Sequence, residues 1–266
     1  MSDSDHMERE QRHKVIMRTI DRPGITRIDA LTQLTGVSAV TIRRDLVELE
    51  QAGFLARTHG GAKRVPKRGT PQPFAVRQAE DRADKVILAQ ATAQLIADDE
   101  AVIIDNGTTC QAVAQELAGR PITALCLSLH SAVALGSRAG TNVFIPGGPV
   151  ENDSLALSGP AVITALRDFS ADAVILGSCS TSLSHGLATT TYDDAENKRA
   201  AINAATRRIL VVSARKLNHV STFRFADVSD LHQLVTTSDA PREILAEIRD
   251  LGVQVITVPG PDQRRG

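Results

Sequence analysis

Two adjacent arginines stand on a segment whose polar side chains could contact DNA. In residues 39–51, the apolar residues Ile42, Leu46 and Leu49 recur at offsets of four and three, which predicts the buried face of a helix. The opposite face, near the start of that helix, presents four side chains: Val40, Thr41, Arg43 and Arg44. Arginine can bond guanine through two donors and threonine can meet a base edge, so this face could bind a duplex.

The preceding residues supply the elements that would position this face. Residues 8–20 and 27–35 have helical apolar spacing, the latter with Ile28, Leu31 and Leu34 expected inward. Gly36 and Val37 form a turn, and Ser38 is a good N-cap for the third helix. Three such helices match a helix-turn-helix, although the spacing alone also allows a helical bundle with surface arginines.

A hairpin and a linker are expected next. Gly53 stops the third helix, Phe54 and Leu55 can start a strand, and the glycines after His59 can form a tight turn before Ala62. We therefore expect a winged DNA-binding domain over residues 8–62. Residues 63–76 are rich in proline and basic side chains, which predicts a linker.

The remaining chain, from residue 77 to about 260, has the pattern of an α/β domain. A long helix is expected over 77–97, after which short apolar runs alternate with helical segments. This alternation predicts a mostly parallel sheet covered by helices. The expected strands are 101–105, 122–127, 142–146, 173–177, 209–213, 233–237 and 253–258.

Several loops after these strands could bind an anionic ligand. The loop Asp105, Asn106, Gly107, Thr108, Thr109 leads into a helix, whose N-terminus favours an anion, although glycine and threonine also serve there as caps only. Open α/β sheets bind ligands at the carboxyl ends of strands, which adds further candidates: Gly147, Gly148, Gly177, Ser178 and Cys179. The candidate phosphate partners are Lys85, Lys198 and Lys216, each of which could equally be a surface lysine.

Composition limits the other classes of function. Residues 1–70 hold 13 basic and 9 acidic side chains, whereas the remainder holds 17 and 22, so a polyanionic partner is expected for the first part only. The polar start and the lack of a long apolar run predict no signal peptide and no membrane span. Three irregularly spaced cysteines fit a reducing cytoplasm and are expected to be buried small apolar residues rather than a redox or metal sensor. No metal or other cofactor is expected.

Residues 35–62 resemble the signature of the DeoR family of bacterial transcription repressors. The likeness rests on Val37-Ser38, on the run from Thr41 to Leu46 and on the run from Arg57 to Ala62. It implies DNA contacts by Ser38, Thr41, Arg43, Arg44, Arg57 and His59, with Lys63 and the wing on the phosphate backbone. Asp45, which is unsuited to a groove by its charge, is expected to orient an arginine or to cap locally.

The C-terminal part is similar to the effector domain of that family, which resembles sugar-phosphate isomerases in fold. This resemblance implies that a sugar phosphate binds across the loop from Asp105 to Thr109. Ser128, the loops at 147–148 and 177–179, and Lys198 or Lys216 would lie nearby. The sequence departs from the family pattern in three places, with Asn106, Cys126-Leu127-Ser128 and Ser213 where other polar residues are usual. These departures leave the effector open.

The resemblance therefore implies a repressor of carbohydrate-metabolism genes that a sugar or sugar phosphate releases from operator DNA. The expected partners are double-stranded DNA, a small effector and further copies of the chain, as a dimer or tetramer. Two alternatives remain: a sugar-phosphate isomerase using Asp105 or Glu196 as its base, and a DNA-binding oligomer with no effector. We expect no catalysis, because neither carboxylate has an evident activated partner in the sequence.

Overall fold

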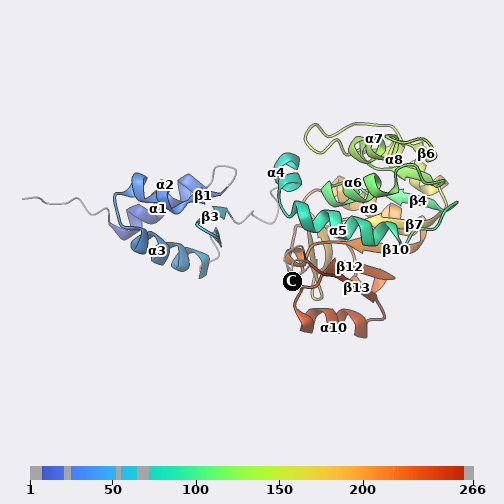
Figure 1. Ribbon diagram of the computed structural model, residues 1–266. Helices are drawn as coiled ribbons and strands as arrows, with labels where there is room; N and C mark the ends of the chain where they lie inside the picture. Colours follow the sequence, from blue (N-terminus) through green and yellow to red (C-terminus); the bar gives the residue numbers. More distant parts are fainter. Residues whose placement is uncertain (1–7, 21–24, 52–54, 65–71, 218, 261–266) are drawn as a thin grey trace, which may run out of the picture. The chain divides into compact units, whose positions relative to one another are not determined.

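The computed structural model describes residues 8–20, 25–51, 55–64, 72–217 and 219–260 of the 266-residue chain. The chain divides into two compact units, and the boundary between them in the sequence lies between Lys67 and Arg68. Figure 1 shows the helices and strands of each unit. The expected Phe54 and Gly53 lie outside the described residues.

The N-terminal unit is a winged helix-turn-helix. Its elements are α1 (Arg9–Ile20), β1 (Thr26–Arg27), α2 (Ile28–Thr35), α3 (Ala39–Gln51), β2 (Leu55–Thr58) and β3 (Gly61–Arg64). The strands form an antiparallel sheet in the order β1-β3-β2. Ile16 and Ile20 of α1 pack with Leu31 of α2 and with Ile42 and Leu46 of α3 in one apolar core.

One expectation about this core was wrong. Leu34, predicted to face inward, is 56% exposed, and Thr35 is buried instead. The α2 helix is only eight residues long, so one narrow stripe reaches the core, through Leu31 and Thr35. The Thr35 hydroxyl donates to the carbonyl of Leu31 at 2.6 Å, so its burial leaves no unpaired donor.

The C-terminal unit contains a seven-stranded sheet in which every neighbouring pair is parallel. Its order is β13-β12-β10-β7-β4-β5-β6. The strands are β4 (Ala101–Ile104), β5 (Thr123–Cys126), β6 (Asn142–Phe144), β7 (Ala171–Leu176), β10 (Ala205–Val211), β12 (Gln233–Thr237) and β13 (Gln254–Val258). This confirms the predicted α/β domain.

Helices cover both faces of this sheet, and the buried residues form one core on each side. One face packs against α5 (Arg82–Ala93), α6 (Thr108–Leu117) and α7 (Leu129–Leu135). The other packs against α8 (Pro160–Asp168), α9 (Tyr192–Asn203) and α10 (Arg242–Asp250). Strand residues alternate between the two cores, as Ile103 and Ile104 do in β4.

A second, antiparallel sheet was not expected from the sequence. It consists of β8 (Ser180–Ser182), β9 (Gly186–Thr189) and β11 (Phe223–Ala226), in the order β11-β9-β8. Its first strand follows directly on the loop after β7. It therefore adjoins the carboxyl edge of the parallel sheet.

The predicted helix over 77–97 is in fact two helices. The first, α4 (Phe74–Ala79), ends at Glu80, and α5 begins after Asp81, whose φ of 50° lies in the left-handed region. Lys85 Nζ donates to the carbonyls of Arg77 and Glu80, so it satisfies acceptors that the end of α4 leaves without helical partners. The strand β3 includes Lys63 and α4 begins at Phe74, so both ends of the expected linker 63–76 have regular structure.

Candidate functional site

The start of α3 presents an exposed polar and basic face. Ser38 Oγ accepts from the amide of Thr41 at 3.2 Å, so Ser38 caps the helix as predicted. Val40 is 73% exposed, and the side chain of Arg44 is 83% exposed and 3.7 Å from Glu48. Arg43 is also exposed. The helix thus offers two cations to a ligand while Ile42, Leu46 and Leu49 stay in the core.

Asp45 joins α3 to the first helix. Its two carboxylate oxygens accept from Arg12 Nε at 2.5 Å and from Arg12 Nη2 at 3.0 Å, and both side chains are buried. Burial alone would raise the pKa of Asp45, but the hydrogen bonds from Arg12 and His13 outweigh it and lower the pKa. Asp45 therefore orients an arginine, as expected, and that arginine comes from α1.

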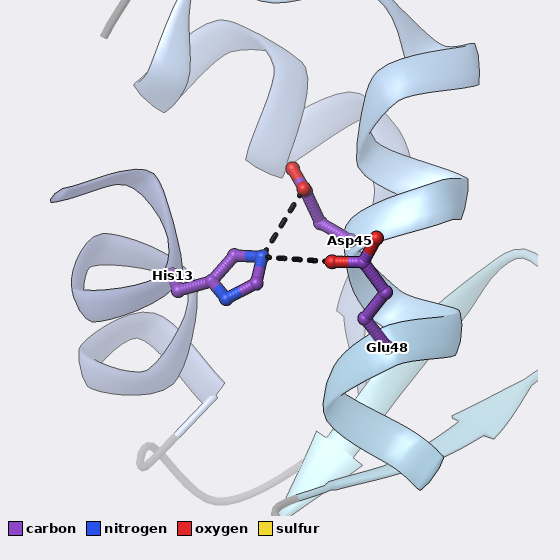
Figure 2. A group of neighbouring side chains, drawn as sticks. All are labelled: His13, Asp45 and Glu48. Carbon is purple, nitrogen blue, oxygen red and sulfur yellow. Dashed lines mark hydrogen bonds and ion pairs between the residues drawn. The ribbon is translucent and has the colours of Figure 1, made fainter. Parts of the chain in front are cut away.

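Figure 2 shows His13 of α1 pointing between Asp45 and Glu48 of α3. The ring nitrogen Nε2 is 3.2 Å from Asp45 and 3.8 Å from Glu48, and such a set of ligand atoms could hold a metal ion. Arg12 already bonds both oxygens of Asp45, however, and Arg9 pairs with Glu48. We therefore interpret the group as an ion-pair network that fixes α3 on α1. Because α3 carries the exposed basic face, it is called the recognition helix below.

The wing is the hairpin of β2 and β3, and its Arg57 is already bonded to α3. Arg57 of β2 donates its backbone amide and its Nε to Glu50 of α3, at 2.9 and 2.5 Å. The turn residue His59 is exposed, and Lys63 in β3 is half-buried. Arg57 thus attaches the wing to the recognition helix, and it would contact DNA only through its remaining donors.

The effector candidates meet where the chain reverses its direction across the sheet. The strands β4 and β7 are neighbours, but the chain first proceeds from β4 to β5 and β6. At such a switch point, the loops diverge and leave room for a ligand. Asp105 after β4 accepts from the amide of Gly177 after β7 at 2.9 Å, so the two predicted loops are in contact.

Asp105 is fully buried and half satisfied. Its Oδ2 also accepts from Lys198 of α9, while Oδ1 has no partner among the described residues. Burial raises the pKa of Asp105, and the ammonium of Lys198 opposes this rise. Because a buried polar atom without a partner costs free energy, Oδ1 is suited to accept from a ligand hydroxyl.

A second carboxylate, Asp194, completes this group. It accepts from Asn106 Nδ2 at 2.6 Å and from Thr189, and lies 3.3 Å from Lys198. Sequence reasoning missed Asp194, although its spacing of four residues from Lys198 on one helix was a usable signal. Thr189 is the last residue of β9 in the unexpected second sheet, and no sequence signal could have placed it beside Asp194.

The first turn of α6 offers backbone donors to the same place. Gly107 has a φ of 106°, which a residue with a side chain would adopt only with strain, and it leads directly into Thr108 and Thr109. No side chain caps this helix in the described structure. Its first amides and its dipole therefore remain available to an anion.

The three candidate lysines have different surroundings. Burial alone would lower the pKa of Lys198, but the carboxylates of Asp105 and Asp194 outweigh this effect and raise it, so Lys198 is already neutralised. Lys216 donates to the carbonyl of Ser178 at 2.8 Å and has no carboxylate within 4 Å among the described residues. Burial lowers the pKa of Lys85 to about 8, and Lys85 caps α4.

The remaining candidates have their described contacts outside this group. Ser128 caps α7 by accepting from the amide of Ser131 and bridges to Ala156. Gly147 and Gly148 are exposed, and a side chain on Gly148 would lie 2.7 Å from the carbonyl of Ser158. The described contacts do not join these two glycines to Asp105 or Lys216.

The cysteines only partly match the expectation. Cys110 and Cys126 are buried, and burial raises the pKa of both thiols, to about 12 for Cys126. Cys179 is exposed, contrary to the prediction, because it stands in the turn between β7 and β8. Its sulfur is 3.6 Å from the hydroxyl of Thr189, which places it beside the effector candidates.

Both units match known domain families. Residues 12–68 match the DeoR-like helix-turn-helix domain, and residues 80–238 match the DeoR C terminal sensor domain. The chain belongs to the DeoR family. It is therefore a DNA-binding transcription regulator with a C-terminal sensor domain, and the family is one of regulators rather than of enzymes.

Curated relatives of this DeoR-family chain are similar over most of their length. The transcriptional repressor AccR of Agrobacterium fabrum is 33% identical, over 79% of this chain and 83% of that protein. A putative aga operon transcriptional repressor of Escherichia coli O157:H7 is 30% identical, over 94% and 93%. The regulator GlpR of Haloferax volcanii is 27% identical, over 93% and 96%.

Among solved structures, ribose 5-phosphate isomerase A of Methanocaldococcus jannaschii is similar with a TM-score of 0.38 and 12% identity. The similarity covers 50% of this chain and 53% of that chain. Within the described part of the chain, every helix is too short or too polar to cross a membrane.

Proposed function

We propose that this regulator represses transcription by occupying operator DNA and that a sugar phosphate binding in the sensor unit releases it. The observation that supports this most directly is the half-satisfied Asp105 at the switch point, where Gly177 donates to Asp105 and the next residue, Ser178, accepts from Lys216. Asp105 Oδ1 would accept from a sugar hydroxyl, while Lys216 and the first turn of α6 would hold the phosphate. This arrangement offers one acceptor, one cation and a helix N-terminus to one ligand.

Lys216 is a better phosphate partner than Lys198. The ammonium of Lys198 faces two carboxylates, so a phosphate there would meet net negative charge. Lys216, by contrast, is bonded only to a backbone carbonyl in the described structure. We therefore assign Lys198 the task of holding Asp105 and Asp194 in place, and Lys216 the task of binding the anion.

The effector half of this proposal is tested by thermal unfolding against a panel of sugar phosphates and their unphosphorylated parents. A ligand at ~100 times its dissociation constant should stabilise the protein by ~2.7 kcal/mol. We expect the stabilisation to need the phosphate and to disappear in Lys216→Ala. The matched control is Arg242→Ala, which removes an exposed cation at the start of α10. Equal stabilisation of both variants would overturn the assignment.

The DNA half is tested with a duplex that the wild-type protein selects from a random pool. Arg43→Ala or Arg44→Ala should weaken binding by ~1–3 kcal/mol for each hydrogen-bonded base pair that the arginine no longer reads. Arg18→Ala, which removes an exposed cation of α1, serves as control. Affinity should also fall with salt, at a log–log slope of ~−0.9 per neutralised phosphate. Unchanged selected-site binding in both variants would contradict the assignment.

A symmetric operator would need two copies of the chain. In a dimer or tetramer, two recognition helices would lie roughly 34–36 Å apart, one turn of DNA. Sedimentation of the full-length protein tests this part of the proposal. A protein that stays monomeric at the concentration at which it binds DNA would contradict it.

Catalysis is the second function to be tested, because Asp105 belongs to the proposed effector site. Its carboxylate is tied to Lys198 and Gly177, and Glu196 is exposed on α9 with no described contact to this group. A general base must reach the proton that it removes, and neither carboxylate is arranged for that. We expect no isomerised sugar phosphate in NMR spectra after prolonged incubation.

A further inference from the structure

The strand β6 and the loop after it form an exposed apolar segment. Phe144 is 54% exposed, Ile145 is 49% exposed, and Val150 in the loop is 40% exposed. Residues 139–150 contain no charged side chain, although 23% of the chain is charged. Because exposed apolar surface of this kind marks protein–protein contacts, the segment is a candidate interface.

β6 also has backbone groups available for pairing. It pairs with β5 on one side and has no other neighbour among the described strands. Asn142 donates its amide to the carbonyl of Ile122 at 2.9 Å, so alternation along the strand directs the amide and carbonyl of Val143 away from β5. An edge of this kind can accept a further strand.

The chain after β6 turns back and leaves this edge open. Gly147 and Gly148 have φ angles of 77° and 98°, and they lead to Val150, which forms a bridge with Leu157. The effector site has no described contact with these two glycines. Their positive φ instead serves the turn that follows the edge strand.

The opposite edge of the sheet has a different character. There β13 exposes the polar side chains of Gln254 and Thr257, and its Val258 is buried. At the β6 edge, by contrast, the helix α7 packs against the strand and adds Val133, which is 74% exposed. Of the two edges, β6 is therefore the apolar one.

A second copy of the chain is the occupant that this edge fits. Two identical strands that pair antiparallel are related by a two-fold axis, so one edge supplies both halves of the contact. With Val143 on the axis, the two Val143 residues exchange their backbone hydrogen bonds, and Asn142 lies opposite Phe144 of the other copy. The two Phe144 rings are then diagonal neighbours within reach of each other.

Charge favours a second copy over a different partner. A strongly acidic or basic partner would find no ion pair in residues 139–150, whereas two identical uncharged surfaces do not repel each other. The edge lacks the charged side chains that keep other edge strands apart.

We propose that β6 is a self-association surface of the sensor unit, at which two copies join their seven-stranded sheets by antiparallel pairing about Val143. This inference rests on the proposed function, in which a symmetric operator needs two copies of the chain. It assigns that assembly to one strand and one register.

Sedimentation equilibrium of the full-length protein tests the surface. The wild type should be a dimer or tetramer, and Phe144→Asp should raise the dissociation constant of one assembly step by about a hundredfold, because it places like charges beside the axis. The matched control is Leu251→Asp, which changes an apolar side chain that is 48% exposed after α10. It should assemble as the wild type does.

A disulfide tests the register, and it does not require the edge to tolerate a charge. Positions 142 and 144 of different copies would have Cα atoms about 4.5 Å apart, within the range of a disulfide. In a Cys179→Ser background, which lacks the exposed native thiol, Asn142→Cys combined with Phe144→Cys should give a linked dimer on mild oxidation. Either substitution alone should not, because its copies would be diagonal, roughly 7–8 Å apart.

The outcomes separate this inference from the proposed function. A monomeric wild type would overturn both the pairing at β6 and the oligomer that the proposed function requires. An oligomer that Phe144→Asp leaves intact, or a double variant that stays unlinked, would overturn the pairing at β6 and leave the proposed oligomer, operator binding and effector site standing.

Discussion

At the scale of single residues, Asp45 determines how firmly the recognition helix is held. It accepts two hydrogen bonds from Arg12, which is 9% exposed, and a third from His13. Removing one charge of a buried pair leaves the other without compensation, which is more costly than the net contribution of the pair. The position of the side chains that would bind DNA therefore depends on the buried contact between Arg12 and Asp45.

We expect Asp45→Asn to lower the unfolding free energy of the N-terminal unit by about 3 kcal/mol. The pKa of Asp45 is lower in the folded state than in the unfolded chain, so its stabilising contribution is present above the unfolded pKa and is lost as pH falls through the folded one. Urea unfolding at several acidic pH values, followed by circular dichroism, should show a smaller acid-induced loss in the variant.

The matched control for this experiment is Asp29→Asn, which removes an exposed carboxylate at the start of α2. It should leave both the stability and its pH dependence close to those of the wild type. An Asp45→Asn protein with the full acid-induced loss of the wild type would show that another group is responsible.

At the scale of elements, the wing depends on two adjacent glycines for different reasons. Gly60 has a φ of 92° and open space around it, so it supplies the turn. Gly61 lies against β1, where an added Cβ would be 2.2 Å from the carbonyl oxygen of Thr26. The turn and the third strand of the sheet therefore impose separate requirements on neighbouring positions.

Gly61→Ala should separate β1 from β3, because the clash is with backbone and no rotamer can relieve it. We expect faster amide exchange at Arg27 and Ala62, whose partners across these two strands are Gly61 and Thr26, and weaker DNA binding through the displaced wing. Gly60→Ala tests the turn instead, at a cost of roughly 1–2 kcal/mol for the left-handed conformation. If Gly61→Ala proves milder than Gly60→Ala, the close approach to β1 is not what limits this position.

The elements also show which features the sequence could predict. Apolar periodicity located α1, α3 and the parallel strands, because each pattern is repeated over a whole element. The break between α4 and α5 was missed, since residues 77–97 contain no glycine or proline and the left-handed residue at the break is Asp81. The candidate effector loops were identified, but Lys198 and Asp105 are 93 residues apart, and only the folded chain shows that they neutralise each other.

At the scale of the whole molecule, the two units have separate cores. Ile42 and Leu46 pack only within the N-terminal core, and Leu210 lies in one of the two cores that flank the large sheet. A unit with its own core can unfold on its own, so the full chain should not behave as a single two-state system.

The chain contains a convenient probe of this independence. It has one tyrosine, Tyr192 at the start of α9, and no tryptophan, so its intrinsic fluorescence reports on the sensor unit alone. Circular dichroism reports on the helices of both units. Urea unfolding followed by the two signals should therefore give curves that do not coincide.

A matched pair of core substitutions assigns the two transitions. Leu46→Ala and Leu210→Ala each remove a leucine side chain that is at most 1% exposed, at a cost of about 2–5 kcal/mol. The first should move only the transition that tyrosine fluorescence does not detect, and the second only the one that it does. If Leu46→Ala instead moved the fluorescence curve, or Leu210→Ala moved the transition that fluorescence does not detect, the two units would be energetically coupled.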